Sequence, residues 1–92
     1  MRIAMWKGSI EQLAADWNAI EKERGTTVSS HTWTTDSGGT TTVGLQNASI
    51  DAGTAEVEVT ANESGQDLVK CLAIFADGTK AAAWWEIKVK DR

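Results

Sequence analysis

The feature that most constrains this chain is the recurrence of short β-type segments, separated by turn residues at roughly ten-residue intervals. In residues 55–61, Ala and Val at the odd positions alternate with Glu and Thr at the even positions, which is typical of a strand with one buried face. Other apolar or β-branched segments have the same character: residues 26–35, 43–50, 68–75 and 81–89. Turn residues separate them at Gly38-Gly39, Asp51-Ala52-Gly53, 62–65 and Asp77-Gly78. The sequence therefore predicts an all-β fold, an antiparallel β-sandwich.

The pattern of residues 9–25, in the N-terminal part of the chain, fits two kinds of secondary structure. As a helix, the segment would begin at a Ser9 cap and end before Gly25. Its apolar face would then contain Ile10, Leu13, Trp17 and Ile20. As a strand, it would place Leu13, Ala15 and Trp17 on one face. The sequence leaves both open. Residues 1–10 are expected to form an N-terminal arm outside a single sandwich domain of residues 11–92.

The turn at Asp77-Gly78 determines which side chains of the last hairpin point inward. In a three-residue loop with Gly78 in the left-handed conformation, Cys71 lies opposite Ala83. The inward set is then Val69, Cys71, Ala73, Ala83, Trp85, Ile87 and Val89. A two-residue loop would instead bury the Lys70 ammonium without a partner, which is costly. The three-residue loop is therefore predicted.

This register leaves an apolar set on the outward side of the same hairpin: Leu68, Leu72, Ile74, Ala82 and Trp84. A free monomer seldom exposes such a patch, so either the N-terminal segment covers it or another subunit does. We expect an assembly surface, to which Trp6 of the arm contributes. The predicted partner-interface residues are Trp6, Leu68, Leu72, Ile74 and Trp84, and the predicted core residues are Trp33, Val57, Val59 and Trp85.

Composition excludes several classes of function. The 92 residues contain thirteen acidic and nine basic side chains, a net charge of −4, which argues against nucleic-acid binding. No apolar run approaches the ~20 residues of a membrane-spanning helix. Cys71 is the only cysteine, so no intrachain disulfide can form, and folding in a reducing cytoplasm is expected.

The sequence contains no recognisable catalytic or ligand-binding constellation. His31 is the only histidine, and Cys71, the only thiol, is expected inside the sandwich as a small apolar residue. The isolated acidic residues Asp36, Asp51, Asp67 and Asp77 are expected at turns, bonded to the local backbone. We therefore predict a protein that is not an enzyme, with no catalytic residues, no metal site and no cofactor.

A family resemblance adds to this reading. Trp33 in an early strand, Cys71 in the penultimate strand and Asp77-Gly78 before the last strand resemble an immunoglobulin-like domain, although the first cysteine of that domain is missing. More closely, residues 11–92 resemble small immunoglobulin-like virion proteins of tailed bacteriophages. The resembling residues are Asp16-Trp17, 27–34, 55–59, Asp77-Gly78 and 87–91. The resemblance implies an immunoglobulin-like antiparallel β-sandwich with an N-terminal arm or short helix, in which Asp16-Trp17 belongs to a strand.

The same resemblance implies a structural role in a virion that is assembled in the host cytoplasm. Such a protein decorates or cements the capsid by docking on the shell of the major capsid protein. Its expected partners are the major capsid protein, other virion proteins or further copies of itself, and neither nucleic acid nor a membrane. The alternative is a tail or head fibre adaptor, or a module that recognises a glycan on the host surface.

Overall fold

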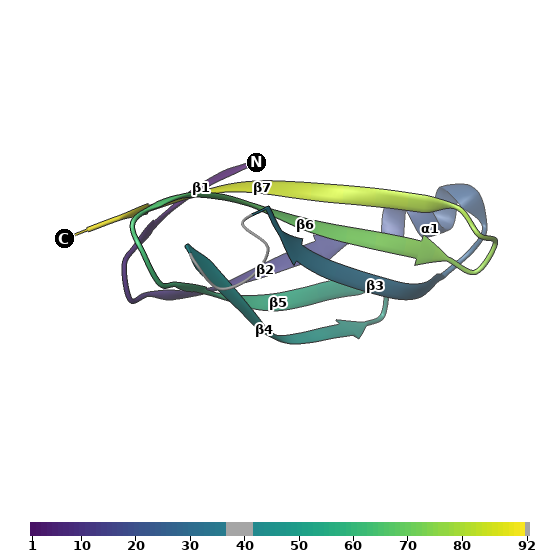
Figure 1. Cartoon of the computed structure of the whole chain (residues 1–92). Coiled ribbons are helices and arrows are strands. Elements are labelled where there is room, and N and C mark those ends of the chain that lie inside the picture. Colours follow the sequence, from purple (N-terminus) through teal and green to yellow (C-terminus); the bar gives the residue numbers. More distant parts are fainter. Residues whose placement is uncertain (37–41, 92) are drawn as a thin grey trace.

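The computed structural model describes residues 1–36 and 42–91, which form two facing β-sheets and one short helix (Figure 1). In chain order the elements are β1 (Arg2–Trp6), β2 (Ile10–Asp16), α1 (Asn18–Arg24), β3 (Val28–Thr35), β4 (Val43–Asp51), β5 (Thr54–Ala61), β6 (Gly65–Phe75) and β7 (Lys80–Lys90). The predicted strands at 26–35, 43–50, 55–61, 68–75 and 81–89 are confirmed, with ends that shift by a few residues. The predicted turn at Gly38-Gly39 lies outside the described residues.

The fold is an immunoglobulin-like β-sandwich. One sheet has the strand order β1-β7-β6-β3 and the other the order β2-β5-β4. The order β3-β6-β7 matches strands C, F and G of an immunoglobulin domain, and β2-β5-β4 matches B, E and D. All of these neighbours are antiparallel, whereas β1 pairs with β7 in parallel. The predicted fold class is therefore confirmed.

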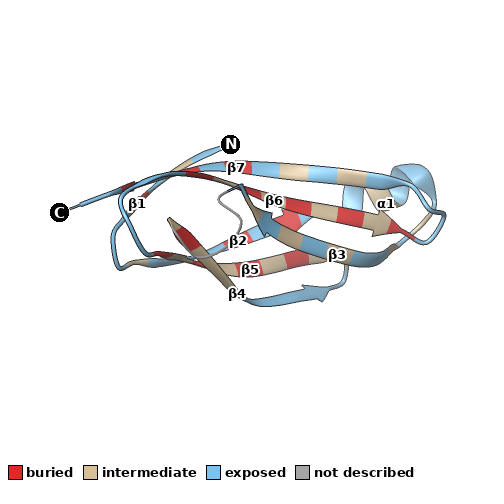
Figure 2. Ribbon diagram, in the orientation of Figure 1, coloured by how far each residue is buried: buried red, intermediate tan, exposed pale blue. Residues whose placement is uncertain are grey.

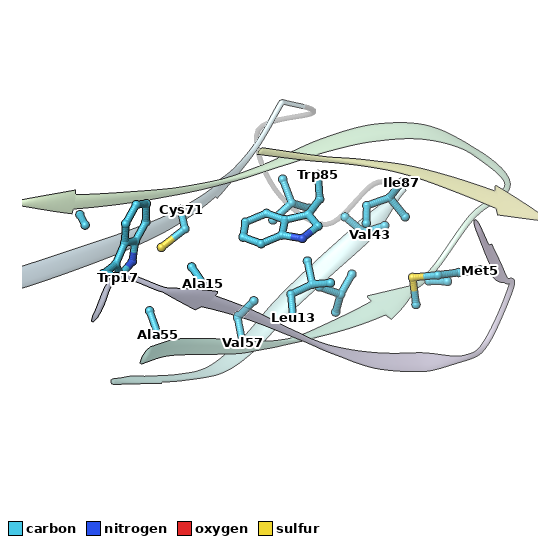
Figure 3. Packing of buried hydrophobic residues seen from close by; sticks show 14 of the residues in the cluster. Met5, Leu13, Ala15, Trp17, Val43, Ala55, Val57, Cys71, Trp85 and Ile87 are labelled. Atoms are coloured by element: carbon cyan, nitrogen blue, oxygen red, sulfur yellow. The ribbon is translucent and has the colours of Figure 1, made fainter. Parts of the chain in front are cut away.

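The core lies between the two sheets and is built mainly from alternate residues of β2, β5, β6 and β7, to which Met5 of β1 and Val43 of β4 are added (Figure 2). Figure 3 shows Trp17, Cys71, Trp85, Leu13 and Val57 meeting in this layer. Of the predicted core residues, Val57, Val59 and Trp85 are buried, and the half-buried Trp33 packs on Trp85 with ring centroids 5.3 Å apart. Aromatic rings at such spacings contribute both buried area and a favourable ring–ring geometry.

The predicted register of the last hairpin is confirmed. Cys71 lies opposite Ala83, and the Phe75 N–H donates to the Thr79 carbonyl oxygen at 2.8 Å. Gly78 has φ of 87°, a left-handed conformation that glycine adopts without strain. The Asp77 carboxylate accepts hydrogen bonds from the Thr79 N–H (3.0 Å) and hydroxyl (2.7 Å), which stabilises the turn.

Residues 9–25 contain both of the elements that the sequence left open. Ile10–Asp16 forms β2, which pairs with β5 and buries Leu13 and Ala15. The helix α1 then begins at Asn18 and ends where Gly25 takes the left-handed conformation, as the helical interpretation predicted. The Ser9 cap is wrong, because the Ser9 hydroxyl instead donates to the Trp6 carbonyl oxygen at 2.6 Å. Tertiary pairing with β5 outweighs the local helical pattern over residues 10–16.

The prediction of an arm outside the sandwich at residues 1–10 is wrong. Residues 2–6 form β1 at the edge of the four-stranded sheet, beside β7. Met5 points inward and is only 3% exposed, so this segment contributes to the core. The pairing satisfies those polar backbone groups of β1 that face β7, which an unattached arm would leave to water. The sandwich domain therefore begins at the first strand and not at residue 11.

Candidate functional site

The predicted interface residues of the last hairpin lie on the outer face of the four-stranded sheet. Because β6 has Val69, Cys71 and Ala73 fully buried, the residues between them point away from the core. Strand β7 continues this outward surface beside β6. We call the apolar part of it the apolar strip, which comprises Leu68, Leu72, Ile74, Ala82 and Trp84.

Cross-strand pairing brings the members of the apolar strip together. Leu72 is paired with Ala82 and Lys70 with Trp84, so these side chains are neighbours on one face. Leu68, Leu72 and Ile74 are half-buried, Ala82 is exposed, and the Trp84 side chain is 49% exposed. The predicted cluster at positions 68, 72, 74 and 84 therefore exists, and its side chains are incompletely covered by their own molecule.

Lys70 lies within the apolar strip and caps its largest side chain. The Lys70 ammonium is 5.1 Å from the centroid of the Trp84 ring. A cation over an indole at this distance contributes about 0.5–1 kcal/mol at an exposed site. One face of the indole is thus already engaged, while the apolar stem of Lys70 covers part of the strip.

The strip ends in a polar region near β1. Leu68 is paired with Glu86, and the Glu86 carboxylate accepts a hydrogen bond from the Arg2 Nε at 3.0 Å. An open hollow of about 910 Å³ adjoins Leu68 at this end, and charged side chains such as Arg2, Glu86 and Lys88 line it together with the apolar Ile3 and Ile87. The apolar surface therefore passes into a charged depression on the same face.

Trp6 does not join the other predicted interface residues. It lies on the outer face of the same sheet and is 51% exposed, but its partner in the register is Lys90. Lys90 is six residues beyond Trp84 along β7, which corresponds to roughly 20 Å at the rise of a β-strand. Trp6 can contact the same partner only if that partner extends along the whole sheet.

The position of β1 also decides between the two explanations of the exposed patch. The N-terminal segment does not cover the apolar strip, because β1 lies at the sheet edge beside β7 and not across β6. The sequence could not reveal this, since a strand of five residues carries no signal for its neighbour. The strip therefore remains open to an external partner.

The side chains that could take part in chemistry or bind a metal ion do not lie together. Cys71 is a free thiol and fully buried, and burial raises the pKa of this thiol although the Trp17 indole partly lowers it, so the thiol stays protonated at neutral pH. His31 lies half-buried on β3, paired with Ala73. In the described part of the chain, no group of three or more His, Cys, Asp or Glu residues could hold a metal ion.

The acidic residue Asp67 lies elsewhere than predicted. Asp67 belongs to β6, not to a turn, and is 7% exposed at a position paired with Ile87. Its carboxylate accepts a hydrogen bond from the Leu68 N–H at 2.8 Å. Strand β6 begins earlier than expected because residues 65–67 pair with β7.

Among the described residues, no helix is long and apolar enough to cross a membrane.

Comparison with known proteins does not assign a family. No protein-family model matches the chain, and no curated protein matches it. A solved structure to which the chain is similar is the solution structure of Amebosin, with 14% sequence identity and a TM-score of 0.47 over 97% of this chain and 88% of that chain. A similarity this distant identifies neither a family nor a function.

Proposed function

We propose that the chain is a non-enzymatic structural protein of a phage virion, a capsid decoration or cement protein that docks on the shell of the major capsid protein. The observation that supports this proposal is the apolar strip, whose Leu, Ile and Trp side chains lie on an outer sheet face that the N-terminal strand does not cover. The phage context comes from the resemblance of residues 11–92 to small virion proteins of this fold.

The outer face has the dimensions of a protein interface. Strands β6 and β7 each contain 11 residues, which corresponds to a length of roughly 36 Å. Four strands spaced by about 4.8 Å give an area on the order of 600 Å², comparable with the ~800 Å² per partner of a standard interface. Burying the remaining exposed apolar area would contribute about 25 cal/mol per Å² before the cost of association.

Binding to purified shells tests this proposal. The full chain is added to shells of the phage that encodes it, prepared without this protein, and the bound fraction is measured by co-sedimentation. Trp84→Ser should reduce binding at least tenfold, because an exposed aromatic anchor at an interface commonly contributes ~2 kcal/mol or more. The matched control is Ile10→Ser, since Ile10 is 60% exposed on the outer face of the other sheet and should not affect binding.

The outcomes separate this function from the alternatives. If the shells do not bind the wild-type chain, decoration is wrong, and binding to purified fibres or to host polysaccharide would then favour an adaptor or a glycan-recognition module. If Trp84→Ser destabilises the fold as strongly as it weakens binding, Trp84 acts as a core residue and the apolar strip does not support docking. Thermal unfolding of both variants supplies this control.

A further inference from the structure

The two outer faces of the sandwich carry opposite charge. The outward positions of the four-stranded sheet contain the cations Arg2, Lys70, Lys80, Lys88 and Lys90, and the only carboxylate among its outward strand positions is Glu86. The outward positions of the three-stranded sheet contain Asp16, Asp51, Glu56 and Glu58, and no Lys or Arg. A chain with a net charge of −4 thus presents a positively charged face.

Most of this positive charge is available to a partner. Arg2 is paired with Glu86 at 3.0 Å, and Lys70 lies over the Trp84 ring. In the described part of the chain, the exposed ammonium groups of Lys80, Lys88 and Lys90 have no carboxylate within ion-pair distance. Asp36 lies at the edge of the face, in the lining of the hollow. The apolar strip is therefore flanked by cations that its own molecule does not neutralise, with Lys80 at one end and Lys88 and Lys90 beyond Glu86 at the other.

The opposite face differs in this respect, because its central carboxylates, Glu56 and Glu58, have partners within the sheet. The Gln12 amide donates to Glu56, and the Asn47 amide donates to Glu58 at 2.9 Å. Gln46 donates to the same Glu58 oxygen at 3.3 Å. These hydrogen bonds link neighbouring strands. They give the carboxylate oxygens uncharged donors, so the negative charge of the face is not neutralised. This face shows no comparable apolar strip.

These properties exclude the simplest partners for the apolar strip. A second copy docking with the same face would bring the two sets of cations together, and such like-charge contacts strongly disfavour an interface. A second copy docking with its acidic face would offer charge complementarity but few apolar side chains for Trp84 and its neighbours. A nucleic acid would satisfy the lysines but not the aliphatic strip, since phosphate contacts are polar.

We propose that the partner covering this face is a different protein with an acidic surface around an apolar centre. This inference rests on the proposed docking function and adds the chemistry of the partner to it. The apolar strip supplies buried area, while Lys80, Lys88 and Lys90 select and orient the acidic partner. The acidic three-stranded sheet then points away from the partner.

Peptides of defined charge test this inference without knowledge of the natural partner. The probes are three synthetic peptides of equal length that alternate Glu with Leu, Glu with Ser, or Lys with Leu, together with a single-stranded oligothymidylate of equal charge. The full ¹⁵N-labelled chain is titrated with each probe and followed by NMR. The Glu-Leu peptide should bind most tightly and shift the outward residues of β6 and β7. The Glu-Ser peptide should bind roughly tenfold more weakly because it lacks apolar contacts.

A charge-reversal variant tests whether the peptide is bound by the lysines of this face or only attracted by positive charge anywhere on the protein. Lys88→Glu should weaken binding of the Glu-Leu peptide roughly fivefold, since exposed ion pairs contribute modestly. The matched control Lys22→Glu makes the same charge change at an exposed position of α1, outside the outward strand positions of this sheet, and should have little effect. Raising the salt concentration should weaken the Glu-Leu complex as well.

Several results would overturn the inference. Equal affinity for the Glu-Leu and Lys-Leu peptides would show that charge does not select the partner. Tighter binding of the oligothymidylate would assign the face to nucleic acid, and shifts confined to other surfaces would remove the apolar strip from the site. If Lys88→Glu binds shells as the wild type does, the charge inference fails while decoration stands. If only the peptides bind and the shells do not, decoration fails while the partner chemistry stands.

Discussion

Strands β5 and β6 occupy equivalent central positions in the two sheets, yet their outward faces are opposite in character. Inward, both present alternate residues that are almost fully buried and, apart from Asp67 of β6, apolar, as the colours of the two strands in Figure 2 show. Outward, β5 presents Thr54, Glu56, Glu58 and Thr60, whereas β6 presents Leu68, Lys70, Leu72 and Ile74. The fold therefore requires only the inward pattern, and the large apolar residues of β6 are not explained by packing within the sandwich.

The largest expected effect contrasts two adjacent tryptophans on the two sides of β7. Trp85 is 5% exposed and packs on Trp33, so Trp85→Ala should lower the free energy of unfolding by about 3–5 kcal/mol. Trp84→Ala should cost about 1 kcal/mol, because Trp84 is 49% exposed and loses mainly the Lys70 contact. Urea denaturation measures both. Similar losses would mean that β7 has no functional outer side.

The second largest expected effect contrasts two adjacent residues of β1, the strand at the sheet edge. Met5 is 3% exposed in β1, so Met5→Ala should lower the free energy of unfolding by about 2–3 kcal/mol. Trp6→Ala, at the neighbouring and 51% exposed position, should cost less than about 1 kcal/mol. Chemical denaturation compares the two variants. An insensitive Met5 would indicate that residues 2–6 detach from β7 in solution.

A smaller effect concerns the outward residues of β5 and β6 themselves. Leu72→Thr and Glu58→Thr should each change the free energy of unfolding by less than about 1 kcal/mol, since Thr suits a strand and neither side chain belongs to the core. Only Leu72→Thr should weaken binding to shells. A loss of several kcal/mol for Leu72→Thr would assign the apolar strip a role in folding and remove the contrast between the strands.

The smallest expected effect concerns the turn that holds the β6–β7 register. Hydrogen bonds from the Thr79 hydroxyl and N–H lower the pKa of the Asp77 carboxyl. The ionised form therefore stabilises the fold above the unfolded pKa of about 3.9, and this contribution disappears as the pH falls through the lower folded value. The difference in thermal midpoint between the wild type and Asp77→Ala should be greatest near pH 6 and shrink below about pH 3.

The companion variant Thr79→Ala removes the hydroxyl donor alone and should show the same pH trend with a smaller amplitude. A difference that does not change with pH would show that Asp77 acts through backbone conformation and not through its charge. Because a one-residue shift of register would exchange the two faces of the hairpin, this turn determines which residues form the apolar strip.

Much of the fold could be predicted because its signals are local. The alternation in residues 55–61 predicted β5. The Asp77-Gly78 turn, together with the cost of burying the Lys70 ammonium, predicted the hairpin register that points Cys71 inward. The candidate cluster at Leu68, Leu72, Ile74 and Trp84 followed directly from that register. Trp6 was assigned to this interface only because a tryptophan on an arm would be costly to leave exposed, whereas its distance along the sheet depends on the pairing with Lys90.

The amino-acid sequence determined the strands from β3 to β7 and which side chains of the last hairpin face the core, because strand alternation and turn conformation act over a few residues. Only the tertiary structure decided that residues 2–6 lie beside β7, that residues 10–16 extend against β5, and that basic and acidic side chains collect on opposite faces. Those outcomes depend on which strands share a sheet, and that choice is made by pairing between segments far apart in the chain.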